Sequence, residues 1–196
     1  MKKRMFLAAA IAVMFVFASV ILTGCSGGSN DIDKESSVSQ VFHVIDTKDL
    51  SGGRFDAGNY SKYKVTMINT WATWCSACVD EMPDIGKLAK YYSKNGNDVQ
   101  IVGLLTQTNR ATGILLKGIT DSERTKAEKI ISDTGADYTH ILVSENLSSV
   151  LSSELNVFPT TFFVNSEGYL IGDPVQGSHS EDEWKSIIKE KLAAVE

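Results

Sequence analysis

The feature that most constrains the fold is a short apolar strand that leads into two closely spaced cysteines and then into an amphipathic helix. Residues 65–70 are mostly apolar and rich in β-branched side chains, which is typical of a buried strand. Cys75 and Cys78 follow in the segment Trp-Ala-Thr-Trp-Cys-Ser-Ala-Cys. From Cys78 onward, apolar residues recur at steps of three and four, and this spacing predicts a helix with one buried face. The two thiols therefore lie at a strand-to-helix junction.

The positions of the two cysteines predict different roles for them. Cys75 falls at or just before the first helical turn, where unpaired backbone N–H groups and the helix dipole stabilise a thiolate. Cys78 lies one turn later on the same face, so it can attack a mixed disulfide and release the product. We therefore predict a catalytic pair for thiol–disulfide exchange, with Cys75 as the nucleophile.

Two other interpretations of the cysteine pair are weaker. A structural disulfide would close so short a loop that it would remove little entropy from the unfolded chain. A zinc site usually needs four ligands. The sequence has no cysteine after this pair, and its only histidines, His43, His140 and His179, stand at scattered positions. We expect no metal, and no cofactor other than the redox-active disulfide itself.

The N-terminus predicts the compartment. A basic start at residues 2–4 precedes an almost wholly apolar stretch at residues 5–22, and Leu-Thr-Gly-Cys follows, ending at Cys25. This arrangement resembles a bacterial lipoprotein signal peptide, which implies cleavage before Cys25 and lipidation of its sulfur. The alternative is an uncleaved transmembrane anchor, because about 18 apolar residues could nearly span a bilayer. Both interpretations predict an extracytoplasmic protein on a membrane tether, in a compartment where thiols become oxidised.

Composition divides the chain into three regions. We predict a signal peptide at residues 1–24, a flexible polar stalk at residues 25–40 and a single domain at residues 41–196. The chain has 24 acidic against 19 basic residues, and residues 2–4 would take three of the basic ones away with the signal peptide. This acidic excess argues against nucleic acid as a partner.

Within the domain, predicted strands and helices alternate. The strands are expected at residues 41–45, 54–55, 64–70, 99–105, 138–143, 160–165 and 169–172, and the helices at residues 75–94, 120–134, 145–155 and 181–194. Early crossovers through helices and a late hairpin predict an α/β fold, a mixed sheet with helices on both faces. The stretch at residues 106–120 exceeds a simple link. It is either a client-recognition loop or, as we favour, a segment whose leucines pack on the sheet.

Two separated motifs carry a resemblance to a known family. Asn-Thr-Trp-Ala-Thr-Trp-Cys-Ser-Ala-Cys-Val-Asp-Glu-Met-Pro at residues 69–83 is followed by Phe-Pro-Thr-Thr-Phe-Phe-Val at residues 158–164 and by Gly168. In order and spacing these motifs resemble the membrane-tethered thioredoxin-like proteins of the TlpA/ResA type, over nearly all of residues 41–196. The resemblance implies a thioredoxin-like fold and thiol–disulfide oxidoreductase activity.

The resemblance also implies a client-binding segment. Pro159 would be a cis-proline that faces the cysteines, and the backbone of Phe158 would pair with an extended client segment. Trp74 and Thr160 would complete this site. The sequence alone leaves open a trans-proline at the start of a strand.

Glu81 is the candidate proton acceptor for Cys78. It lies one turn beyond Cys78 and matches the acidic residue that follows the motif in ResA-type proteins. Thioredoxin has a buried aspartate where this chain has Asn69, so that carboxylate is not available here. The alternative is a solvated glutamate on the surface of the helix.

The charges around the cysteines predict the direction of electron flow. The intervening residues Ser76 and Ala77 add no positive charge, whereas Asp80, Glu81 and Asp84 place negative charge on the same helix. Because carboxylates disfavour a nearby thiolate, we expect a reducing pair that acts as a reductase.

The resemblance implies partners for such a reductase. A membrane thiol carrier of the DsbD/CcdA kind would recharge it. Its clients would be apocytochrome c, during cytochrome c maturation, methionine sulfoxide reductase, or proteins with mispaired disulfides. Two alternatives remain, a disulfide-forming oxidase and a copper-binding chaperone module that would use both thiols and His140 or His179.

Overall fold

The computed structural model describes residues 32–96, 98–109 and 111–196. The predicted signal peptide and the lipidation site at Cys25 lie outside the described residues and stay predictions. Within the described ranges, no helix is long and apolar enough to cross a membrane.

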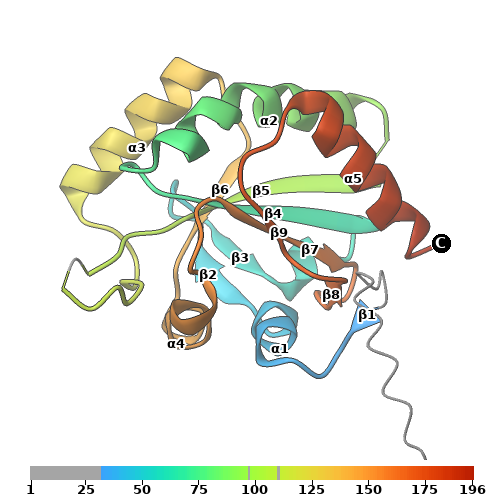
Figure 1. Ribbon diagram of the computed structural model, residues 1–196, viewed down its shortest axis with the longest axis horizontal. Helices are drawn as coiled ribbons and strands as arrows, with labels where there is room; N and C mark the ends of the chain where they lie inside the picture. The colour runs from blue at the N-terminus through green and yellow to red at the C-terminus, as the bar shows by residue number, and fades with distance from the viewer. Residues whose placement is uncertain (1–31, 97, 110) are drawn as a thin grey trace, which may run out of the picture.

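A mixed sheet forms the centre of the molecule (Figure 1). In the described part of the chain it has seven strands, in the order β1 (Ile32–Asp33), β8 (Leu170–Ile171), β7 (Thr160–Asn165), β4 (Val65–Trp71), β5 (Val99–Leu105) and β6 (Thr139–Leu142), with β9 (Val175–Gln176) paired to β7. Strands β4, β5 and β6 are parallel, whereas β7 runs antiparallel to β4. Strands β2 (Asp46–Lys48) and β3 (Arg54–Asp56) form a separate hairpin. This arrangement confirms the predicted α/β class.

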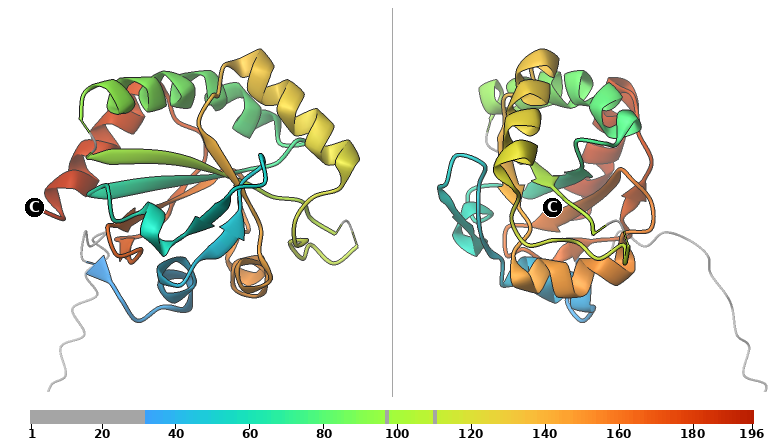
Figure 2. Two further views of the ribbon diagram at one scale, coloured as in Figure 1. Left: turned by 180° about the vertical axis from the view of Figure 1, so that it is seen from behind. Right: turned by 90° about the vertical axis from the view of Figure 1, so that its left-hand side faces the viewer.

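Helices cover both faces of the sheet (Figure 2). One face carries α2 (Ser76–Lys94), α3 (Asp121–Thr134) and α5 (Glu181–Ala193), and the other carries α1 (Ser37–His43) and α4 (Glu145–Glu154). A short 3-10 turn at Ala57–Asn59 follows β3. Helix α3 begins and ends where the sequence predicts, because the Thr120 side chain caps its first turn and Gly135, with φ of 67°, ends it in the left-handed region.

Strand β4 positions the cysteine pair. All of its residues are buried, because β5 and β7 flank it and helices lie on both faces of the sheet. Its carboxyl end at Trp71 leads through a short loop into α2. The strand-to-helix junction predicted from the sequence is therefore present at the middle of the sheet.

The predicted strand at residues 41–45 is wrong. Helix α1 occupies most of that segment, with the Ser36 side chain accepting the N–H of Ser39 as a cap. Val38, Val41 and Phe42 are buried on one face at helical spacing. A short apolar run fits the period of a strand as well as that of a helix, and the Ser36 cap favours the helix.

The domain also begins earlier than the boundary predicted at residue 41. Strand β1 pairs with β8, and α1 starts within the segment assigned to the stalk. Val38 belongs to one hydrophobic cluster of the core, and Ile32 packs against another. The rest of the predicted division, a signal peptide and a stalk before Ile32, stays a prediction.

Within residues 106–120, one large apolar side chain packs in the core and two are exposed. Leu115 is 2% exposed and belongs to the core, where its backbone bridges to Thr108. Ile114 and Leu116 remain exposed at 49% and 36%. The packing prediction therefore holds for Leu115, and its two apolar neighbours face outward.

Candidate active site

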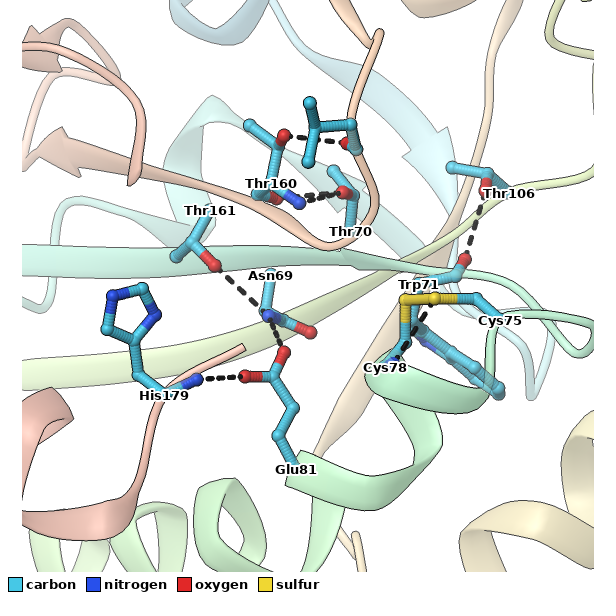
Figure 3. Close-up of a disulfide and its surroundings, with 11 residues drawn as sticks. Asn69, Thr70, Trp71, Cys75, Cys78, Glu81, Thr106, Thr160, Thr161 and His179 are labelled. Carbon is cyan, nitrogen blue, oxygen red and sulfur yellow. Dashed lines mark hydrogen bonds between the residues drawn. A yellow bond between two sulfur atoms is a disulfide. The ribbon is translucent and has the colours of Figure 1, made fainter. Parts of the chain in front are cut away.

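Cys75 and Cys78 form a disulfide at the amino end of α2, with an S–S distance of 2.02 Å (Figure 3). Cys75 is the N-cap residue, and its Sγ accepts the backbone N–H of Cys78 at 3.2 Å. In the reduced protein, such a donor at a helix end stabilises a thiolate on Cys75. Cys75 is 6% exposed and Cys78 is completely buried. The predicted placement of the two cysteines is confirmed.

An apolar rim lies beside the disulfide. Trp74 is 58% exposed, and its ring meets that of Phe158 edge-on with centroids 5.3 Å apart. Phe158 also packs against the apolar cluster that contains both cysteines. The peptide bond from Phe158 to Pro159 is cis, as the resemblance implied. Among the hydrogen bonds within the described residues, none occupies the backbone N–H or carbonyl of Phe158, so both groups remain available to an extended client segment.

Thr160 has an internal role that the sequence did not predict. It is 3% exposed, and its N–H donates to the Thr70 hydroxyl at 3.0 Å, while that hydroxyl donates to the Thr160 carbonyl at 2.7 Å. Its own hydroxyl donates to the carbonyl of Val157 at 2.8 Å. Thr160 thus fastens the cis-proline segment to β4, and a direct client contact stays a prediction.

Glu81 lies buried one helical turn after Cys78. Its residue is 4% exposed, so the alternative of a solvated surface glutamate is wrong. One carboxylate oxygen accepts the Nδ2 hydrogen bond of Asn69 at 2.8 Å, and the other accepts the backbone N–H of His179 at 3.1 Å (Figure 3). The second oxygen also accepts the Nε1–H of Trp184 at 3.3 Å. Burial raises the pKa of Glu81 above its ordinary value, because the charged form loses its hydration. The three hydrogen bonds and the charge of His179 oppose that rise.

Asn69 orients the carboxylate, a role that sequence reasoning missed. Its amide nitrogen is shared between Glu81 and the hydroxyl of Thr161, the latter at 3.0 Å. Its amide oxygen is buried with no hydrogen-bond partner among the described residues. The contact with Trp184 was also missed, although a buried indole N–H needs an acceptor and so gave a signal.

A second buried polar group, His140, lies in the neighbouring part of the sheet. Its Nδ1 accepts the indole N–H of Trp71 at 3.1 Å, and its Nε2 donates to the carbonyl of Ala136 at 2.9 Å. Burial lowers the pKa of His140 to about 4. His140 is part of β6 and 4% exposed, so it is a buried strand residue.

The copper-binding alternative needs a free histidine beside the thiols. Both ring nitrogens of His140 are already occupied, and Nδ1 of His179 lies 3.0 Å from the carbonyl of Gly177. Among the residues that the structure describes, no group of three or more His, Cys, Asp or Glu side chains is arranged to hold a metal.

Comparisons with known sequences place this site in context. A family model described as Redoxin matches residues 35–188. The thiol:disulfide interchange protein DsbE of Haemophilus influenzae is 30% identical over 123 residues, which span 63% of this chain and 56% of that protein. DsbE of Vibrio cholerae is 26% identical over 187 residues, 91% of this chain and 88% of that protein. The thioredoxin-like protein YneN of Bacillus subtilis is 25% identical over 148 residues, 74% and 72% of the two chains.

Solved structures share the fold. A secreted Mycobacterium tuberculosis disulfide oxidoreductase homologous to Escherichia coli DsbE superposes with a TM-score of 0.53 at 18% identity, covering 78% of this chain and 96% of that one. StoA from Bacillus subtilis superposes with a TM-score of 0.52 at 17% identity, covering 72% and 93%. At this level of identity the likeness shows a thioredoxin-like fold.

Proposed function

Because the chain belongs to the Redoxin family and is a thioredoxin-like thiol–disulfide oxidoreductase, we propose that it reduces the disulfides of client proteins. The observation that carries this proposal is the arrangement at the start of α2. Cys75 caps the helix beside an exposed apolar rim, and Cys78 lies buried behind it, one turn before a buried carboxylate. This arrangement separates a sulfur that attacks from a sulfur that resolves.

The exchange proceeds in two steps. The Cys75 thiolate attacks one sulfur of the client disulfide, so a mixed disulfide forms and the other client sulfur leaves as a thiolate that takes up a proton. Cys78 then passes its proton toward Glu81 and attacks the Cys75 sulfur. The Cys75–Cys78 disulfide forms, and the second client sulfur leaves and is protonated. Two electrons have moved from the cysteine pair to the client.

The charges near the sulfurs support the reducing direction. No cationic side chain lies between the cysteines, where Ser76 and Ala77 stand, and Glu81 places a buried acidic group behind them. Strong oxidants instead stabilise their thiolate form. Equilibration with glutathione of known redox ratio tests this direction. We expect a potential closer to about −270 mV, typical of thioredoxin, than to about −120 mV, typical of a dedicated disulfide-forming oxidase.

We also propose that the protein works outside the cytoplasm on a lipid anchor at Cys25. The basic start, the apolar stretch and the Leu-Thr-Gly-Cys sequence support this location. Mass spectrometry of the mature N-terminus is expected to find lipid on Cys25, and Cys25→Ala is expected to release the protein from the membrane or leave its precursor unprocessed. A mature terminus elsewhere, without lipid, would contradict the anchor.

The partners of this reductase follow from the resemblance. A membrane thiol carrier of the DsbD/CcdA kind would keep the cysteine pair reduced, and clients would include apocytochrome c, methionine sulfoxide reductase or proteins with mispaired disulfides. Capture with the Cys78→Ser variant in the native host, followed by mass spectrometry, identifies the clients. A set of captured proteins that need new disulfides, together with an oxidising potential, would favour the oxidase instead.

A further inference from the structure

The loop between β9 and α5 touches two parts of the site. At one end, the N–H of Gly177 donates to the carbonyl of Pro159 at 2.9 Å. At the other end, the N–H of His179 donates to the Glu81 carboxylate at 3.1 Å. Between them, Nδ1 of His179 lies 3.0 Å from the carbonyl of Gly177 and must donate, because a carbonyl oxygen only accepts. A chain of hydrogen bonds therefore connects the cis-proline segment with the buried carboxylate.

The imidazole of His179 also contacts the second donor to that carboxylate. Its ring lies against the indole of Trp184, with centroids 4.7 Å apart. Trp184 is completely buried, and its Nε1 reaches the same Glu81 oxygen at 3.3 Å. The half-buried His179 therefore holds the loop in place through its side chain, supplies one donor itself and packs on the other.

We propose that His179 is a positioning residue that holds the Glu81 carboxylate behind the redox cysteines and links it to the client-binding segment at Pro159. This inference rests on the proposed function, in which Glu81 accepts the proton of Cys78. The loop that holds Gly177 and His179 is thereby fixed to the Pro159 carbonyl at one end and to the Glu81 carboxylate at the other.

The other groups around Glu81 supply no positive charge. Asn69 from β4 and Trp184 from α5 are neutral donors. Tyr138, from the segment before β6, stays neutral because burial raises the pKa of its hydroxyl far above its ordinary value. Cys78 is the proton donor itself. Among the described residues with these contacts, His179 is the one whose charge lowers the pKa of Glu81.

The test uses reduced, full-length protein in a Cys75→Ser background, so that Cys78 reports alone at the active site. Its alkylation by iodoacetamide is measured against pH by mass spectrometry of the peptide that contains it. We expect His179→Gln to raise the midpoint pH by about half a unit, because a loop that is held less firmly donates less well to Glu81 and leaves the carboxylate less well placed to accept the proton of Cys78.

His43→Gln is the matched control. His43 is also half-buried, its Nδ1 lies 2.7 Å from the carbonyl of Glu167, and its ring stacks on Tyr169 at 4.1 Å. It lies in α1 on the other face of the sheet. We expect the midpoint pH of Cys78 to stay unchanged in this variant. A shift equal to that of His179→Gln would overturn the inference.

A double variant separates this inference from the role of Glu81. In a Glu81→Gln background, His179→Gln is expected to cause no further shift, because its effect passes through the carboxylate. An undiminished shift would show that His179 acts independently of Glu81 and would overturn the inference. If Glu81→Gln by itself left the midpoint unchanged, the proton-acceptor role in the proposed function would fail. If Glu81→Gln moved the midpoint and His179→Gln did not, only the positioning role would fail.

Discussion

Glu81 and His140 are buried to the same extent near the redox cysteines, yet their surroundings differ. Each residue is 4% exposed, and burial shifts both pKa values toward the neutral form, upward for the acid and downward for the base. His140 has one partner on each ring nitrogen. Glu81 follows Cys78 by one turn and is connected to the surface through His179. Burial alone therefore does not identify a proton-transfer group. The position of the group relative to the sulfur identifies it.

The largest expected effect concerns the two redox sulfurs. Cys75→Ser should abolish both turnover and client capture, because the helix-cap sulfur is the nucleophile. Cys78→Ser should still attack but stop as a covalent mixed disulfide. Insulin reduction and non-reducing gels measure the two outcomes. If Cys75→Ser still trapped clients through Cys78, Cys78 would be the attacking sulfur. Glu81 would then lie behind the sulfur that attacks and not behind the one that resolves.

The second prediction concerns the stability contributed by His140. Its pKa is about 6.5 in the unfolded chain and about 4 in the fold, so the unfolded state binds more protons between these values. The contribution is complete above pH 6.5 and falls as the pH drops toward 4, by roughly 3 kcal/mol in total. Urea unfolding of the parent and of His140→Gln across this range measures it. The variant should be less stable at pH 7 and should lose less stability on acidification. Equal pH slopes would contradict the assignment.

A third prediction concerns the chemistry at Glu81. Glu81→Gln keeps the side-chain size and removes the proton acceptor, so resolution of the mixed disulfide by Cys78 should slow by about a hundredfold. The first attack by Cys75 should keep its rate. Rapid-quench measurement separates the two steps. His140→Gln is the comparison variant, and it should change the stability of the protein without changing the pH profile of Cys78. An unchanged resolution rate in Glu81→Gln would show that Glu81, like His140, takes no part in proton transfer.

The smallest expected effect concerns the packing around His140. A Cβ atom added at Gly103 would lie 2.3 Å from Nδ1 of His140 and 3.1 Å from Nε1 of Trp71, so their hydrogen bond must move. We expect Gly103→Ala to lower the free energy of unfolding by about 2 kcal/mol. The midpoint pH for alkylation of Cys78 should not change. A shifted midpoint would show that the Trp71–His140 pair also controls the cysteines.

Local signals in the sequence predicted most of the elements and failed where two patterns coincide. Helix α3 was found because Thr120 and Gly135 mark its ends. The segment at residues 41–45 was assigned to a strand, because its few apolar residues fit a strand as well as a helix and only the Ser36 cap distinguishes them. Strands β1 and β9 contain two residues each, too few to show any period.

The sequence by itself determined the cysteine pair at the start of a helix, the order of the longer strands and helices after residue 64, and the position of Glu81 one turn beyond Cys78. These properties depend on neighbours within a few residues, which spacing and capping fix. Only the tertiary structure decided what surrounds the Glu81 carboxylate. Its donors on His179 and Trp184 lie 98 and 103 residues further along the chain. They reach it because α5 packs beside α2 over the same face of the sheet, an arrangement set by strand order and burial rather than by any local pattern.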